Sequence, residues 1–256
     1  MIGVYDSGLG GVSVLRAMHR TLPQHTLLYL ADTAYCPYGP LPVEQVQQRA
    51  VACAGWLIEQ GAAVVVVACN TAASAALELL RETYRVPIVG VEPGVKPAIR
   101  ATRTGRIGVL ATGGTLTGQR FARLVQRFAA NVDVLTMPAP ALVEQVEAGE
   151  LDTPHTRTLL HDYLTPLLDH GADTIVLGCT HFHFLAPTIR ELVGPAITLI
   201  DTSLPVAQRV AHIAAAHNVQ PKTGQVHFVT TGDPAQVFAP LRVVWGDVPT
   251  LSHIDC

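Results

Sequence analysis

Short apolar runs rich in β-branched residues alternate along the chain with longer segments in which apolar residues recur every three or four positions. The short runs are typical of buried strands, and they cover residues 2–5, 26–30, 63–68, 88–91, 107–110, 132–135, 174–177, 197–200 and 225–230. The longer segments predict amphipathic helices, whose apolar faces include Val46, Ala50, Cys53 and Leu57 in one helix and Phe121, Leu124, Val125 and Phe128 in another. A further helix is expected over residues 204–217.

Strands that alternate with helices predict an α/β fold in which parallel sheets carry helices on both faces. In such doubly wound sheets, ligands bind beyond the carboxyl ends of the strands. We therefore look for functional residues immediately after the predicted strands.

An internal repeat divides the chain into two halves. Three pairs of segments match in the same order and at nearly equal offsets of 110, 105 and 109: residues 61–71 with 171–181, 2–8 with 107–113, and 88–92 with 197–201. The repeat predicts two similar doubly wound domains, related by pseudo-twofold symmetry, with the active site in the cleft between them. The first domain would comprise residues 1–93 together with 204–256, and the second would comprise residues 94–203.

Composition narrows the class of protein. Hydrophobic residues make up 49% of the chain and charged residues only 14%, which suits strands that are buried on both faces. The net charge of −3 offers no basic surface for nucleic acid, and the longest apolar run, residues 62–69, is too short to cross a membrane. No signal-peptide pattern follows Met1, and five widely spaced cysteines suit free thiols in a reducing compartment. We expect a cytoplasmic protein without nucleic-acid or membrane partners.

Each half ends a predicted strand in a cysteine that is followed by two polar residues: Cys69-Asn70-Thr71 and Cys179-Thr180-His181. A single cysteine after an apolar run is more often core packing, and this is the interpretation we prefer for Cys53. A matched pair is different, because a helix is expected after each strand and a helix N-terminus stabilises a thiolate. Two such thiols facing one cleft could remove a proton from one face of a carbon atom and return one to the other face.

The first predicted strand leads into Asp6-Ser7-Gly8-Leu9-Gly10-Gly11. This segment loosely resembles a dinucleotide-binding loop, with Asp32 as the acid for a ribose. Nucleotide binding is disfavoured, because Ser13 stands at the third glycine position and Asp6 would face the pyrophosphate. Asp6 better suits a cationic substrate group, a proton acceptor for a thiol, or a helix N-cap.

Two further loops follow predicted strands. The hydroxyls and free N–H groups of Thr112-Gly113-Gly114-Thr115 predict either a carboxylate-binding loop or a capped helix start. The stiff segment Pro37-Tyr38-Gly39-Pro40 cannot extend a sheet and is a candidate pocket wall.

A metal site is the alternative for the second cysteine, because Cys179, His181 and His183 alternate along one segment. Zinc motifs usually space their ligands more widely, and no second ligand cluster is obvious, so we expect no metal. His181 is instead the expected acid/base partner of Cys179. Pyridoxal phosphate would need a lysine, and neither Lys96 nor Lys222 has a phosphate-binding loop beside it, so we expect no cofactor.

Together these motifs resemble the glutamate racemases, in order and over most of the chain. The matching segments are Asp6-Ser7-Gly8-Leu9-Gly10-Gly11, Pro37-Tyr38-Gly39, Cys69-Asn70-Thr71, Thr112-Gly113-Gly114-Thr115 and Gly178-Cys179-Thr180-His181. Related racemases for aspartate or hydantoins share the two-cysteine plan, but the Asp-Ser-Gly start combined with Gly-Cys-Thr-His looks like the glutamate branch.

The resemblance implies interconversion of L- and D-glutamate without cofactor or metal, which supplies D-glutamate for peptidoglycan, and homodimers are common in the family. It implies that Cys69 takes the α-proton from D-glutamate and Cys179 takes it from L-glutamate. Asp6 and His181 are the implied auxiliary groups, and the match of Glu147-Ala148-Gly149 to a family pattern selects Glu147, rather than Glu144, as a further catalytic carboxylate.

The implied substrate contacts, with the two threonines of the possible carboxylate-binding loop, are Asp6, Ser7, Tyr38, Gly39, Asn70, Thr71, Thr112, Thr115, Thr180 and His181. One departure from the family is Phe182-His183-Phe184, where Tyr-Pro-Leu is usual. A racemase for another acidic amino acid, such as aspartate, and a two-lobed binding protein without chemistry remain alternatives.

Overall fold

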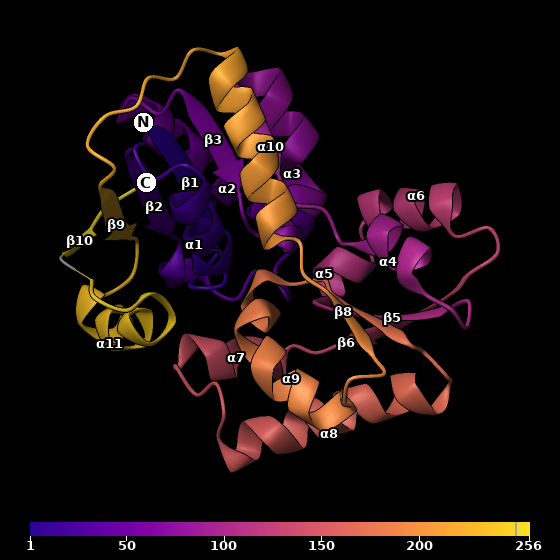
Figure 1. Ribbon diagram of the computed structural model, residues 1–256. Helices are drawn as coiled ribbons and strands as arrows, with labels where there is room; N and C mark the ends of the chain where they lie inside the picture. Colours follow the sequence, from indigo (N-terminus) through magenta and orange to yellow (C-terminus); the bar gives the residue numbers. More distant parts are fainter. Residues whose placement is uncertain (249) are drawn as a thin grey trace.

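The computed structural model describes residues 1–248 and 250–256, and these residues form two parallel β-sheets flanked by helices (Figure 1). The first sheet has six strands in the order β10-β9-β2-β1-β3-β4, and the second has four in the order β6-β5-β7-β8. The predicted α/β class with doubly wound parallel sheets is confirmed.

The strands of the first sheet are β1 (Ile2–Asp6), β2 (Leu27–Ala31), β3 (Val64–Val67), β4 (Ile88–Gly90), β9 (Val226–Thr230) and β10 (Leu251–His253). Every residue of β1, β2 and β3 is buried, because helices cover both faces of this sheet. One face carries α2 (Val43–Glu59) and α3 (Asn70–Thr83), and the other carries α1 (Val12–Thr21) and α10 (Ser203–Ala216). Continuous apolar runs are what such doubly covered strands require.

The second sheet consists of β5 (Arg106–Ala111), β6 (Asp133–Pro138), β7 (Thr174–Leu177) and β8 (Thr198–Ile200). Side chains alternate between its faces along β5: Ile107 and Val109 pack against α4 (Val95–Ala101) and α6 (Gln119–Phe128), whereas Leu110 belongs to the larger core that includes α8 (Pro154–Asp169). The remaining helices are α5 (Gly113–Leu116), α7 (Ala141–Glu147), α9 (Ala186–Val193) and α11 (Pro234–Trp245), with short 3₁₀ turns η1 (Thr33–Tyr35) and η2 (Thr180–Leu185).

The two sheets repeat the same strand order, since β2-β1-β3-β4 corresponds to β6-β5-β7-β8. Equivalent backbone hydrogen bonds extend the pairing just past the strand ends: Ala68 N–H donates to Tyr5 O over 2.8 Å, and Gly178 N–H donates to Leu110 O over 2.8 Å. The next residues along the chain are Cys69 and Cys179. The fold therefore places both cysteines at the carboxyl edge of a central strand.

After the second sheet the chain returns to the first one. Helix α10 packs on α1, and β9 and β10 extend the first sheet beyond β2 (Figure 1). We propose residues 1–93 with 204–256, and residues 94–203, as the two domains. Within the described residues, no helix is both long and apolar enough to span a membrane.

The predicted strands are all present, and their ends either match or differ by up to three residues. Two local features differ from the sequence analysis. The strand β10 lies outside every predicted run, and Cys179 is followed by the 3₁₀ turn η2 instead of an α-helix. Pro187, in the first turn of α9, explains the second difference, because it lacks the N–H that an earlier α-helical turn would need.

Candidate active site

Cys69 caps the N-terminus of α3. Its buried Sγ accepts a hydrogen bond from Ala72 N–H over 3.5 Å and lies 3.6 Å from Ser7 Oγ. Burial, and then the charge on Asp6, raises the pKa of this thiol to about 12, although the Ala72 and Ser7 contacts oppose the shift. The helix N-terminus contributes the expected stabilisation of a thiolate through Ala72 N–H, but desolvation outweighs it in the free protein.

Cys179 has a different neighbour. Its Sγ lies 3.5 Å from Nδ1 of His181, and its side chain caps no backbone N–H of the turn that follows. Ser7 lies beside Cys69, and its neighbour Asp6 accepts the hydroxyl of Thr180, the residue after Cys179, so both buried thiols border the same segment. The structure brings the two predicted cysteines together from equivalent places in the two halves.

His181 is held between Cys179 and Glu147. Its Nε2 lies 2.5 Å from Oε1 of Glu147, the last residue of α7, and the same oxygen accepts Leu9 N–H over 2.6 Å. Burial lowers the pKa of His181, but Cys179, Cys36 and Glu147 together raise it well above the usual value. An imidazolium in this position faces a thiol on one side and a carboxylate on the other.

Asp6 lies buried at the end of β1. One carboxylate oxygen accepts Gly8 N–H over 2.9 Å, and the other accepts the Thr180 hydroxyl over 3.1 Å. Burial raises its pKa, while His181 and these hydrogen bonds oppose the shift. The N-cap interpretation is wrong, because α1 begins at Val12 with Gly11 as its cap.

Hydroxyl groups connect the two halves on the side of Cys69. Thr71 Oγ1 lies 2.9 Å from Thr112 Oγ1, which lies 3.0 Å from Thr115 Oγ1. Asn70 is buried, and within the described residues its Nδ2 has no hydrogen-bond partner. A buried amide donor without a partner is costly unless a ligand supplies the acceptor.

The Tyr38 side chain is engaged away from the thiols. Its buried hydroxyl donates to Asp32, which also forms a salt bridge of 2.8 Å with Arg49. Gly39 approaches the hydroxyl chain, because a Cβ on it would lie 3.5 Å from the Cβ of Thr112. At this loop the main chain, and not the phenol, is therefore what can contact a ligand.

His183 does not join Cys179 and His181. Its Nδ1 lies 2.7 Å from Ser203 Oγ and its Nε2 lies 3.3 Å from Leu177 O. The alternative that Cys179, His181 and His183 hold a metal is therefore wrong in geometry.

Sequence reasoning missed Cys36. Its Sγ, the Glu147 carboxylate and the His181 ring lie within 4.8 Å of one another. Burial, and then the charge on Glu147, raises the pKa of Cys36 to about 12. The available signal was its place immediately before Pro37-Tyr38-Gly39, the loop already predicted to line a pocket.

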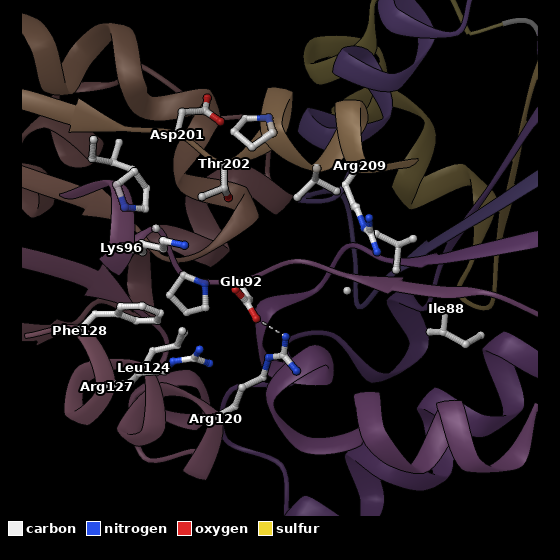
Figure 2. A pocket seen from close by; sticks show the side chains of 18 of the residues that line it. Ile88, Glu92, Lys96, Arg120, Leu124, Arg127, Phe128, Asp201, Thr202 and Arg209 are labelled. Carbon is white, nitrogen blue, oxygen red and sulfur yellow. Dashed lines mark hydrogen bonds and ion pairs between the residues drawn. The ribbon is translucent and has the colours of Figure 1, made fainter. Parts of the chain in front are cut away.

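A cavity of about 720 Å³ lies away from the two cysteines. It is bordered by the segments around β4 and α4 and by those around β8 and α10. Figure 2 shows Lys96, Arg120, Arg127 and Arg209 around it, with Arg120 paired to Glu92 at 2.5 Å. Neither Cys69 nor Cys179 lines this cavity. The size of a cavity therefore does not identify the reactive site in this molecule.

Known proteins match this chain over almost its whole length. The pattern of the Asp/Glu/hydantoin racemase family matches residues 2–210. A glutamate racemase of Pseudomonas aeruginosa is 47% identical over 257 aligned positions, which cover 99% of this chain and 97% of that protein.

Two solved structures share the fold. Glutamate racemase isoform RacE1 of Bacillus anthracis aligns with a TM-score of 0.90 at 31% identity, covering 100% of this chain and 97% of that one. Escherichia coli glutamate racemase in complex with L-glutamate aligns with a TM-score of 0.89 at 31% identity, covering 99% and 98%. This chain belongs to the Asp/Glu/hydantoin racemase family, in its glutamate racemase branch.

Proposed function

We propose that this protein interconverts L- and D-glutamate by two-base proton transfer at the α-carbon, with Cys69 and Cys179 as the two bases. The observation that carries the mechanism is the pair of buried thiols at equivalent strand ends of the two halves, both bordering the Asp6-Ser7 segment. The glutamate racemases among the relatives, and the L-glutamate complex of the E. coli enzyme, support the substrate.

In one direction, the Cys69 thiolate takes the α-proton of D-glutamate. The C–H bond breaks, its electron pair stays on the α-carbon and its carboxylate, and an S–H bond forms on Cys69. The Cys179 thiol then gives its proton to the opposite face, which yields L-glutamate and a Cys179 thiolate. The reverse direction exchanges the two roles, so the enzyme always needs one thiol and one thiolate.

The surroundings of each sulfur suit this cycle in different ways. A thiolate on Cys179 faces the imidazolium of His181, which Glu147 holds in place. A thiolate on Cys69 has the Ala72 N–H and Ser7, but burial holds its pKa near 12. Substrate binding has to help, because the ammonium group of glutamate brings a positive charge into the buried site.

The substrate carboxylate is the natural acceptor for the unpartnered amide of Asn70. The hydroxyls of Thr71, Thr112 and Thr115 supply further donors beside it. The ammonium group suits Asp6, and Ser7, Thr180 and the main chain at Tyr38 and Gly39 complete the contacts. Donors fixed around the carboxylate would stabilise the charge that moves onto it in the transition state.

The proposal also covers the cellular role, the compartment and the partners of the protein. A cytoplasmic enzyme of this kind supplies D-glutamate for peptidoglycan, works without a metal or organic cofactor, and takes a free amino acid as its partner. We include a homodimer in the proposal, to be checked by size-exclusion chromatography with light scattering.

Circular dichroism of the purified protein with L-glutamate tests the function. The expected result is loss of the optical signal toward a racemic mixture, in the presence or absence of EDTA. Faster turnover of aspartate than of glutamate would replace the substrate assignment. Tight glutamate binding without any optical change would indicate the two-lobed binding protein instead.

A further inference from the structure

Three metal-ligating side chains converge beside the proposed acid/base pair. The sulfur of Cys36, a carboxylate oxygen of Glu147 and a ring nitrogen of His181 lie within 4.8 Å of one another. They come from three separate segments: the residue that follows η1, the end of α7 and the turn η2. In the described part of the chain, this is the one group of three or more His, Cys, Asp or Glu side chains with such spacing.

Two glycines leave room for this convergence. A Cβ on Gly8 would lie 2.1 Å from Oε1 of Glu147 and 2.8 Å from Sγ of Cys36. A Cβ on Gly10 would lie 2.3 Å from Nδ1 of His181. Any larger residue at either position would push the ligand atoms aside.

A cavity also leads to the group. It has a volume of about 350 Å³, and its lining includes Leu9, Cys36, Pro37 and Glu147. Cys36 and Glu147 are only partly buried, whereas His181 is buried behind them. A small ion could therefore reach two of the three ligands from this cavity without passing the thiol pair.

The donor set selects the kind of ion. One thiolate, one imidazole and one carboxylate suit Zn²⁺, which commonly takes three protein ligands and leaves a fourth position for water. Calcium and magnesium prefer oxygen ligands and do not fit a sulfur–nitrogen–oxygen set. With bonds of about 2.0–2.3 Å to Zn²⁺, tetrahedral ligands lie about 3.5 Å apart, so the three atoms need to move little.

We propose that Cys36, Glu147 and His181 form an inhibitory binding site for Zn²⁺ at the edge of the active site. The inhibition rests on the proposed function, whereas the binding does not. An ion bound at Nε2 of His181 replaces the contact of that nitrogen with Glu147, and it keeps the ring that faces Cys179 through Nδ1 as a neutral imidazole. Cys179 then has no imidazolium beside it, and the proton transfer from L-glutamate slows.

Cobalt is the probe for the binding, because Co²⁺ replaces Zn²⁺ in such sites and a thiolate ligand gives it an intense near-ultraviolet absorption. Titration of the full chain with CoCl₂ should produce this band, and ZnCl₂ should remove it. The band should be lost in Cys36→Ser and kept in the matched control Cys256→Ser, which removes another partly buried thiol. It should also be kept in Cys69→Ala and Cys179→Ala.

The ligand assignment is overturned if the band survives in Cys36→Ser, if it disappears in Cys179→Ala, or if none forms in the unmodified protein. These spectra do not depend on turnover. They therefore separate failure of the metal site from failure of the proposed racemase function.

Inhibition is measured in a second arm, relative to the metal-free activity of each variant. Half-inhibition by ZnCl₂ should need at least about tenfold more metal in Cys36→Ser than in Cys256→Ser, and EDTA should reverse it. Equal sensitivity of the two variants would overturn the inhibitory role, as would a saturated cobalt site with undiminished turnover.

Discussion

The two halves of this protein share a backbone plan but surround their cysteines differently. Both have the strand order of a doubly wound sheet, and both place a cysteine directly beyond the central strand. Cys69 caps an α-helix and faces a hydroxyl, whereas Cys179 leads a 3₁₀ turn and faces an imidazole. The repeat therefore fixes where the sulfurs lie, and the residues around them give each sulfur a different neighbour.

Equivalent positions show how the difference arises. At the offset of 105, Asp6 of the first half corresponds to Ala111 of the second. At the offset of 110, Thr71 corresponds to His181. Each half thus keeps one ionisable auxiliary group where the other has a neutral residue, and Asp6 reaches across to Thr180 of the other half. Such an arrangement suits two sulfurs that must be in opposite protonation states during turnover.

The largest expected effect is loss of either thiol. Cys69→Ala and Cys179→Ala should each lower kcat at least about a thousandfold, or roughly 4 kcal/mol of barrier, because both directions need one proton acceptor and one donor. Circular dichroism of L- and D-glutamate measures the loss, and thermal unfolding should show both variants folded. A variant that kept a tenth of the normal rate would refute the two-base mechanism.

An isotope experiment sharpens the same point. Reaction of L-glutamate in D₂O should give D-glutamate that carries deuterium, while unreacted L-glutamate stays protonated at early times. One base serving both faces would return some of the original proton to the product.

Removal of the histidine should affect the two directions differently. His181→Asn should lower kcat about a hundredfold, the usual contribution of a positioned acid/base group. Proton removal from L-glutamate by Cys179 becomes the slow step, so the isotope effect with α-deuterated L-glutamate should rise. With α-deuterated D-glutamate it should fall, because reprotonation by Cys179 then limits the rate.

Asp6→Asn is the matched variant in the other half. It should shift the isotope effects in the opposite sense, with the larger effect on D-glutamate. If both variants changed the two isotope effects equally, the assignment of one auxiliary group to each thiol would be wrong.

Asn70 and its counterpart Thr180 offer a comparison of ligand binding with stability. Asn70→Ala should raise KM at least about tenfold, since a hydrogen bond to a charged group contributes roughly 1.5–3 kcal/mol. Its melting temperature should not fall, because Nδ2 has no partner to lose among the described residues. Thr180→Val loses the hydrogen bond to Asp6 and should be less stable by about 1 kcal/mol. A lower melting temperature for Asn70→Ala, with KM unchanged, would make Asn70 structural.

Most of the fold could be predicted from the sequence, because parallel strands covered on both faces leave a strong pattern. The run at Val64–Val67 and its partner at Thr174–Leu177 are buried at every position, and the repeat located both cysteines. The strand β10 could not be predicted, since Leu251–His253 pairs only through β9 and two of its three residues are exposed.

The site was less predictable, because its contacts join distant segments. No sequence spacing places Cys36 beside Glu147 and His181, and the acidity of Cys69 depends on burial, which a helix-terminus argument does not include. The turn after Cys179 was predictable in principle from Pro187, which has no counterpart in the helix after Cys69.

The last expected effect concerns stability alone and leaves turnover unchanged, at another position where the halves differ. Asp173 stands immediately before β7, where the first half has Ala63 before β3. Its carboxylate accepts Thr102 Oγ1 over 2.6 Å, Arg103 N–H over 2.7 Å and Thr104 N–H over 3.0 Å. It thereby fixes the turn that leads into β5. Burial opposes ionisation, but these hydrogen bonds hold the pKa of Asp173 at about 2.

Because the folded pKa lies below the unfolded value of roughly 3.9, the carboxylate stabilises the protein above about pH 4. This contribution is lost as the pH falls through about 2. Asp173→Asn should therefore lower the free energy of unfolding by about 1–3 kcal/mol at pH 7, and the difference from the unmodified protein should shrink in acid. Urea unfolding at several pH values measures this, with Glu82→Gln on the exposed surface of α3 as the control. A deficit that stayed constant down to pH 2 would mean that the shape of the side chain, and not its charge, holds the turn.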